Sequence, residues 1–469
     1  MGLVTILPPV VAILFVLWRK EVVLALIMAI FTSEVILLIN SGASPVFSGF
    51  SQTVERIIHV FQSSGNTRIL VFSLVIGALL ALIKSSGGVT AMVRWLIHTG
   101  MAKSRRHVSF LTTMTGIVVF IESNLSVLTA GILSRGLFDR YGMSRARLAY
   151  IIDSTSAPIC ILILLNAWGA FVLALLENEE LGQPAISVLV GTIPLNFYAL
   201  VTLAIVFYTV FTDRIHGPMK KTEENIQIIE TTEDDVESSH LAYMAVPMSI
   251  MIFGMVTIMY FTGVNSLPAG EEHSFFDKLT AGNGSQSVLY STILATLVAY
   301  IMLLIKRKFN HIQLVKISFE GMGELLPLVS IVLLSLALGD SLRELGTGLY
   351  VAKLVGGALP VVLVIPMLFI SGALISFSTG TSWGTFAILI PLGVPLIQML
   401  NLPPSLAISA ILGGGIFGDH CSPISDTTAV SSIASGCDLL EHVKTQLPYA
   451  LFAGGITVLL YILASYLMM

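Results

Sequence analysis

The stretch that decides the fold is a polar interruption of an apolar segment, and it reads Gly418-Asp419-His420-Cys421-Ser422-Pro423-Ile424-Ser425-Asp426-Thr427-Thr428. It lies inside the apolar run 403–436, which is longer than the roughly 20 residues that one helix needs to cross a bilayer. Polar backbone at such depth is tolerated only where it is buried in protein or lines a wet cavity. Pro423 removes a backbone donor and favours the start of a new helix. We therefore predict a helix that is broken in the middle of a membrane.

The composition of the whole chain agrees with a membrane location. Of 469 residues, 55% are apolar and 11% are charged, whereas a soluble domain carries roughly 25% charged residues. The net charge of −4 gives no basic surface for nucleic acid, and the three cysteines form no C-x-x-C pair. Further apolar runs that suit membrane spans occupy 2–18, 21–40, 68–84, 145–176, 185–211, 241–263, 287–305, 322–341 and 446–468.

Three other polar breaks resemble the first one. The run 145–176 contains Asp153-Ser154-Thr155-Ser156-Ala157-Pro158 and is also predicted to be a broken helix. The stretches 106–134 and 360–400 change direction at Phe120-Ile121-Glu122-Ser123-Asn124-Leu125-Ser126 and at Phe377-Ser378-Thr379-Gly380-Thr381-Ser382-Trp383-Gly384. We predict that both are re-entrant hairpins, because most of the 24 lysine and arginine residues then fall on the cytoplasmic side. Both chain termini are then external.

The order of features repeats along the chain. Lys84 and Arg343 each close a span, Phe120 and Phe377 each open a hairpin tip, and a proline marks each broken helix, all at nearly constant separations. The predicted fold is an all-α polytopic membrane protein with an inverted repeat of two halves, 1–212 and 241–469. Each half has five crossings, one of them broken, plus a re-entrant helical hairpin. An odd number of crossings inverts the second half, as in many secondary transporters. The polar linker 213–240 is expected to be a cytoplasmic loop.

The breaks contain four acids, which are Glu122, Asp153, Asp419 and Asp426. A buried acid costs about 2.5–3.5 kcal/mol on insertion scales. No lysine or arginine lies between Arg147 and Arg214, or between Lys353 and Lys444. A mobile proton or metal cation must therefore neutralise these acids. Burial favours the protonated carboxyl and a bound cation favours the ionised one, so one site can exchange the two by competition.

Two of these motifs, Gly418 to Thr428 and Phe377 to Gly384, resemble the NhaC-type sodium/proton antiporter family, and the resemblance covers most of the chain. That family is similar to a wider ion-transporter superfamily of dimers, in which a transport domain moves against a fixed scaffold. The resemblance implies sodium at Asp153, Asp419 and Asp426, a homodimer, and no cofactor. It implies two clamps: Ser123 and Asn124 with Asp153, Ser154, Thr155 and Ser156, and Ser378, Thr379 and Thr381 with Asp419, Ser422 and Asp426. Glu122 belongs to the first hairpin tip and is a further candidate cation or proton ligand.

Two functions remain open from the sequence. The first is exchange of sodium, or lithium, for protons across a bacterial cytoplasmic membrane by alternating access. The second is a sodium- or proton-coupled carrier of a small organic anion or amino acid, of the malate/lactate type that the same family includes. An intramembrane aspartyl protease is disfavoured, since Ile416-Phe417-Gly418-Asp419 lacks the first glycine of Gly-x-Gly-Asp. Plain structural roles also compete: Asp419 and Asp426 as helix caps, His420 as a hydrogen-bonded structural residue, and the glycines 413–415 as helix packing.

Overall fold

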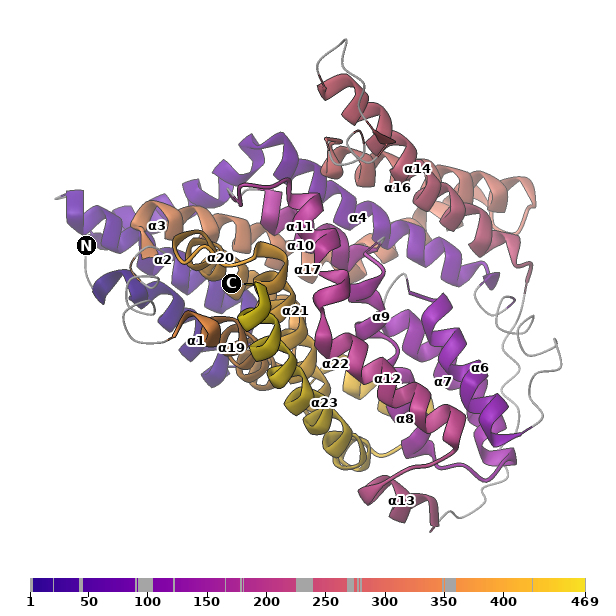
Figure 1. Cartoon of the computed structure of the whole chain (residues 1–469). Helices are drawn as coiled ribbons and strands as arrows, with labels where there is room; N and C mark the ends of the chain where they lie inside the picture. Colours follow the sequence, from indigo (N-terminus) through magenta and orange to yellow (C-terminus); the bar gives the residue numbers. More distant parts are fainter. Residues whose placement is uncertain are drawn as a thin grey trace.

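The computed structural model describes residues 3–19, 21–41, 45–88, 91, 104–120, 123–164, 166–177, 179, 181–224, 239–267, 274–275, 278, 281–347, 350, 360–423 and 425–468. Within these ranges the chain is helical and contains no strand. Nine helical segments in this part are long and apolar enough to cross a membrane. Figure 1 shows them as one bundle of helices with connected packing.

The first part of the chain forms the helices up to the polar linker. They are α1 (Leu7–Arg19), α2 (Val22–Ser41), α3 (Pro45–His59), α4 (Ser64–Ser85), α6 (Arg105–Val118), α7 (Ser123–Arg140), α8 (Arg145–Ser154), α9 (Ala157–Leu162), α10 (Ala167–Glu177), α11 (Ala185–Gly191) and α12 (Phe197–Thr212). Within the described ranges there are also four short 3-10 turns: Leu3–Ile6, Val60–Gln62 and Ile193–Leu195 here, and Val361–Leu363 later. The run 145–176 is thus divided among α8, α9 and α10.

The remaining helices begin within the linker. They are α13 (Gly217–Glu224), α14 (Ala242–Ser266), α16 (Gly284–Ile305), α17 (His311–Leu345), α19 (Val364–Thr379), α20 (Ser382–Met399), α21 (Pro404–Cys421), α22 (Asp426–Ser435) and α23 (Leu439–Met468). Two helices are longer than the spans predicted from hydropathy. Helix α17 extends the span 322–341 at both ends, and α23 begins at Leu439 rather than at 446. At the start of α17, Lys316 pairs with Glu320 one turn later. In α23, His442 contacts Asp153 of a neighbouring helix.

The helices pack in three connected sets. Helices α4, α14, α16 and α17 pack on one another, and α2 joins them through α17. Helices α19, α20, α21, α23 and α12 form a second set, and α6, α7, α8 and α22 form a third. In Figure 1, α14 and α16 lie together at the upper right, while α23 and α12 run side by side through the lower half. Helix α22, from late in the chain, lies against α7 and α8, so residues from both parts of the chain meet there.

Glycines set the closest approach of two helices. A Cβ atom on Gly414 would lie 2.2 Å from the carbonyl oxygen of Phe369, and one on Gly418 would lie 2.2 Å from that of Ala373. Helix α21 can therefore lie directly against α19 only because these positions lack side chains. The expectation that the glycines 413–415 serve helix packing is confirmed at Gly414.

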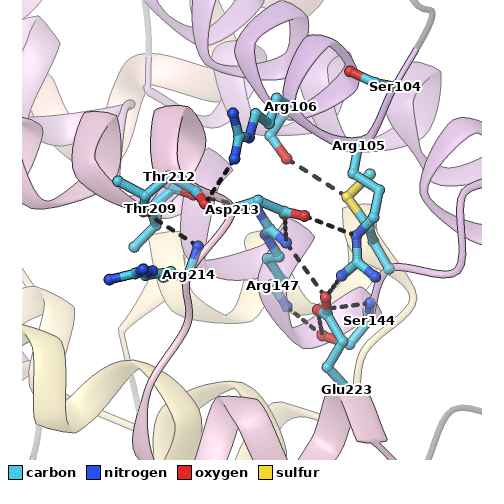
Figure 2. Close-up of polar contacts among 12 residues, drawn as sticks. Ser104, Arg105, Arg106, Ser144, Arg147, Thr209, Thr212, Asp213, Arg214 and Glu223 are labelled. Atoms are coloured by element: carbon cyan, nitrogen blue, oxygen red, sulfur yellow. Dashed lines mark hydrogen bonds and ion pairs between the residues drawn. The ribbon is translucent and has the colours of Figure 1, made fainter.

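The start of the linker is folded and is held by ion pairs (Figure 2). Arg147 in α8 is 1% exposed, and its Nη1 lies 2.7 Å from Asp213 and 3.3 Å from Glu223. Arg105 at the start of α6 pairs with the same two acids. The hydroxyl of Ser144 donates to Glu223 over 3.2 Å. Residues 213–224 are therefore tied to α6 and α8, and the part of the predicted linker at 225–238 lies outside the described residues.

Candidate functional site

The two broken helices end where their sequences predict a change of direction. Helix α8 ends at Ser154, and α9 starts at Ala157 with Pro158 in its first turn. Helix α21 ends at Cys421, and Ser422 is extended. Ser425 then caps α22 by accepting a hydrogen bond from the amide of Thr428. Proline in the first turn accounts for the start of α9, and the hydroxyl cap of Ser425 accounts for the start of α22.

Asp153 is fully buried at the end of α8. Its Oδ2 accepts a hydrogen bond from the side-chain amide of Gln446 at 2.6 Å and lies 3.3 Å from Nε2 of His442. Both partners belong to α23. Its other oxygen, Oδ1, has no hydrogen-bond partner in the described part of the chain. The position of Asp153 is thus fixed through Oδ2, while Oδ1 is left as an acceptor for a further ligand.

Gln446 connects the two breaks. Its Nε2 donates to Asp153 in the first break and, over 3.0 Å, to the carbonyl oxygen of His420 in the second. His420 is buried, and its Nδ1 lies 3.1 Å from the hydroxyl of Tyr198 in α12. The interpretation of His420 as a hydrogen-bonded residue is confirmed. One amide side chain therefore fixes the position of one broken helix relative to the other.

Asp419 lies in the last turn of α21 and is 2% exposed. The hydroxyl of Ser382 at the start of α20 donates to its Oδ2 over 2.7 Å. The hydroxyl of Ser422 donates to the carbonyl oxygen of Phe377 over 2.7 Å. The second break and the second hairpin tip are therefore joined by two hydrogen bonds, one from each side.

The first hairpin tip contacts a later part of the first broken helix. The carbonyl oxygen of Phe120 accepts from Asn166 at 3.0 Å and from the thiol of Cys160 at 3.3 Å. Gly116 packs on Thr155, where an added Cβ atom would lie 2.5 Å from the hydroxyl. Asn124 lines a cavity of about 520 Å³ between α7, α4 and α17, into which Glu320 and Glu324 also face. The tip is thus in contact with α9 and with the α4–α17 pair.

The other predicted residues take different positions. Ser123 is buried, and the side chain of Ser156 is buried with no partner for its hydroxyl among the described residues. Thr155 and Ser378 donate to carbonyl oxygens of their own helices, at Ile151 and Leu374. Thr379 donates within the tip and accepts from the amide of Thr381, and Ser154 lines a small cavity. Glu122 and the side chain of Asp426 lie outside the described residues.

Four residues of the site were missed from the sequence: Ser382, His442, Gln446 and Tyr198. His442 and Gln446 are one helical turn apart, so they lie on the same face of α23. This spacing of two polar residues next to an apolar run was a signal, but the predicted span began at 446 and left His442 outside. Ser382 lies within the quoted hairpin tip, directly after Thr381. No sequence feature indicated Tyr198.

The ligand chemistry suits a hard cation better than a soft metal. No three His, Cys, Asp or Glu side chains gather as a metal-binding group within the described ranges. Besides the imidazole of His420 and the thiol of Cys421, the buried groups at the breaks include carboxylates, hydroxyls and backbone carbonyls, which are oxygen ligands suited to hard ions. A sodium ion here would be bound by few acids and several neutral oxygens.

Comparisons with known proteins agree with this chemistry. Residues 159–466 match the model of the "Na+/H+ antiporter family". An uncharacterised protein of Haemophilus influenzae is 29% identical over 470 residues, covering 94% of this chain and 89% of that protein. A malate-2H(+)/Na(+)-lactate antiporter of Bacillus subtilis is 36% identical over 110 residues, covering 22% of this chain and 23% of that protein. The crystal structure of the YdaH transporter of Alcanivorax borkumensis has a TM-score of 0.60 at 13% identity over 89% of each chain, a likeness of fold alone.

Proposed function

Because the chain belongs to the Na+/H+ antiporter family and is a multi-pass membrane protein, we propose that it exchanges sodium for protons at the acids of its two broken helices. The observation that carries the proposal is the burial of Asp153 and Asp419 beside neutral hydrogen-bond donors and a histidine. No lysine or arginine pairs with Asp153 in the described part of the chain. Such an acid must bind a mobile cation or a proton to remain in a membrane.

Two groups of residues bind the cation or proton in this proposal. The first group is Asp153 with Ser154, Thr155, Ser156, Ser123, Asn124 and Glu122, and the second is Asp419 with Ser378, Thr379, Thr381, Ser422 and Asp426. In each group sodium and the proton compete for one carboxylate, so the two ions are exchanged rather than carried together. Lithium, which is also a small hard cation, is a second substrate of the same sites.

The proposed movement is an alternating-access step of the elevator type. Helices α4, α14, α16 and α17 pack on one another and provide a candidate scaffold. Helices α6–α9 and α19–α22 carry the hairpin tips and breaks and provide a candidate moving body. Both bodies combine residues from the two halves, 1–212 and 241–469, which supports an inverted repeat. We further propose a homodimer in the bacterial cytoplasmic membrane with both termini outside.

A second function follows from one of the relatives. The Bacillus subtilis relative is named for exchange of malate and protons against sodium and lactate. If this chain carries a small organic anion or amino acid, the two acids would hold the coupling cation and the N-termini of α9 and α22 would face the substrate carboxylate. The match covers 22% of this chain, which makes this the weaker of the two proposals.

The deciding experiment uses purified protein in liposomes with a trapped pH-sensitive dye. A pH gradient is imposed, and sodium, lithium, potassium and then malate, lactate and amino acids are added in turn. Proton movement on sodium alone, absent with potassium, is the expected result. No response until an organic substrate is present would replace sodium/proton antiport by the coupled carrier.

A further inference from the structure

A small internal cavity lies between α8, α12, α21 and α23, next to Asp153. Its volume is about 10 Å³, close to the minimum that holds one water molecule. Polar groups on its wall come from seven residues, which are Tyr150, Ser154, Tyr198, Thr202, His420, Gln446 and Tyr449. Of these, only Ser154 belongs to the groups named above. The cavity can therefore hold one small ligand, and most of its polar wall residues lie outside the two binding groups.

Four polar atoms on this wall lack partners. The hydroxyls of Tyr150 and Thr202, Nε2 of His420 and Oε1 of Gln446 are buried and have no hydrogen-bond partner among the described residues. Each of the four side chains is at most 5% exposed. A buried polar atom without a partner lowers stability, and most such atoms in proteins are paired. Their presence on the wall of one cavity indicates a small ligand that takes its partners from among these groups.

The orientation of Gln446 decides which kind of ligand fits. Its Nε2 donates to Asp153 and to the carbonyl oxygen of His420, so both amide hydrogens are used. The amide oxygen is then left to face the cavity. Tyr150 and Ser154, both in α8, are among the hydroxyl-bearing residues of the same wall. The negative charge of Asp153 is one hydrogen bond away, and this favours a monovalent cation over a neutral water molecule.

We propose that the sodium ion of the first group is bound in this cavity, with the oxygens of Gln446, Tyr150 and Ser154 as ligands and Asp153 as the balancing charge. This adds Tyr150 and Gln446 to the binding residues, and it rests on the proposed sodium transport. Gln446 also contacts the second break, so an ion in the cavity couples the positions of the two broken helices.

The test measures sodium binding without transport, so that it can fail separately from the proposed function. Purified protein in detergent is heated in increasing sodium chloride and, in parallel, in choline chloride at the same ionic strength. A ligand that binds only the folded protein raises its melting temperature. The variant Asp419→Asn is used as the background, because it leaves the first group as the sodium site.

Tyr150→Phe in this background removes one unpartnered hydroxyl and little else. The expected result is that Asp419→Asn keeps a sodium-specific rise in melting temperature, and that Tyr150→Phe weakens the apparent sodium affinity about tenfold. Ser154→Ala should act in the same direction. The matched control is Tyr461→Phe, a fully buried tyrosine whose hydroxyl bonds Leu195 and Ser409 away from the cavity. It should melt lower in both salts and keep the sodium-specific rise.

Two results would overturn the proposal. One is an unchanged sodium titration in the Asp419→Asn, Tyr150→Phe double variant. The other is the absence of any sodium-specific rise in Asp419→Asn itself, which would mean that the first group binds no sodium. Either result can occur while the liposome experiment still shows sodium/proton exchange by the wild-type protein.

Discussion

Two regions of this molecule bury charge, and they neutralise it differently. At the ends of α6 and α8, Arg147 and Arg105 are paired with Asp213 and Glu223 (Figure 2). In the core, the carboxylate of Asp153 is more deeply buried than Asp213 and Glu223, and it contacts the amide of Gln446 and the imidazole of His442. An acid with a resident arginine has no charge left to exchange, whereas an acid beside neutral donors can bind a mobile cation. The comparison predicts that the first region serves stability and the second serves transport.

The largest expected effect tests the core region. Asp419→Asn should reduce sodium-dependent proton movement by about 100-fold or more, because loss of one partner of a buried charged contact costs about 2–5 kcal/mol. The melting temperature should stay near that of the wild type, since no resident arginine or lysine is predicted to depend on this acid. Proton flux in liposomes and thermal unfolding in detergent measure the two quantities. Glu320→Gln, at an exposed acid on α17, is the control. Wild-type turnover in Asp419→Asn would remove this acid from the mechanism.

The opposite pattern is expected for the ion-pair region. Arg147→Met should lower the free energy of unfolding by about 3–5 kcal/mol, because it leaves Asp213 and Glu223 with one fewer buried cationic partner. The KM for sodium in the protein that remains folded should not change. Chemical denaturation in detergent micelles checks the first value. Lys220→Met removes an exposed pair with Glu224 and should change stability by less than about 0.5 kcal/mol. A raised sodium KM in Arg147→Met would show that the ion-pair region also takes part in transport.

A smaller effect is expected where one hydroxyl supports a core acid. Ser382→Ala removes the donor to Asp419 and makes its ionised form less favourable, so a proton competes better with sodium. Hydrogen bonds to charged groups contribute about 1.5–3 kcal/mol, which predicts a rise in sodium KM of about tenfold at fixed pH. Ser335→Ala is the matched control, because this buried serine of α17 donates to the carbonyl oxygen of Ile331 in its own helix and belongs to neither binding group. Equal KM values in the two variants would show that the Ser382 contact is irrelevant to sodium.

The smallest effect concerns an acid that shares one property with each region: it is largely buried, in common with Asp153, and it pairs with an arginine, as Asp213 does. Glu179 lies between α10 and α11, and burial raises its pKa to about 7 although Arg343 at 3.1 Å opposes the shift. The folded protein therefore binds a proton more tightly than the unfolded chain, so stability is highest below about pH 4.5 and falls as pH rises toward 7. Because Arg343 is half-exposed and screened, we expect a loss of about 1 kcal/mol. Glu179→Gln should flatten this slope between pH 4.5 and 7. An unchanged slope would show that another group titrates.

The elements that the sequence predicted well are those set by local composition. The breaks at Pro158 and Pro423 follow from properties of a few neighbouring residues. The cap of α22 was missed, because the sequence offered Asp426 as a cap and the structure has Ser425 in that position. Helix ends were predicted less well, since α23 begins at Leu439 and includes His442. A polar residue next to an apolar run continues the helix when a buried partner is present, and only the packed structure shows that partner.

The placement of the first acid could not be predicted from its own neighbourhood. Asp153 was expected to share a clamp with Ser123 and Asn124, yet its described hydrogen bonds go to α23. The partners His442 and Gln446 are 289 and 293 positions away in the chain. Nothing in residues 145–176 indicates which distant helix will lie against them.

The sequence by itself determined that this is a membrane protein, where its helices break, and that its acids lie in those breaks. These properties follow from hydrophobicity, proline and charge, which act over a few residues of chain. Only the tertiary structure decided that Gln446 joins the two breaks, that Ser382 supports Asp419, and that Tyr150 and Gln446 face one cavity. Such contacts depend on which helices pack together, because a side chain is satisfied by whatever group lies within hydrogen-bond distance in space.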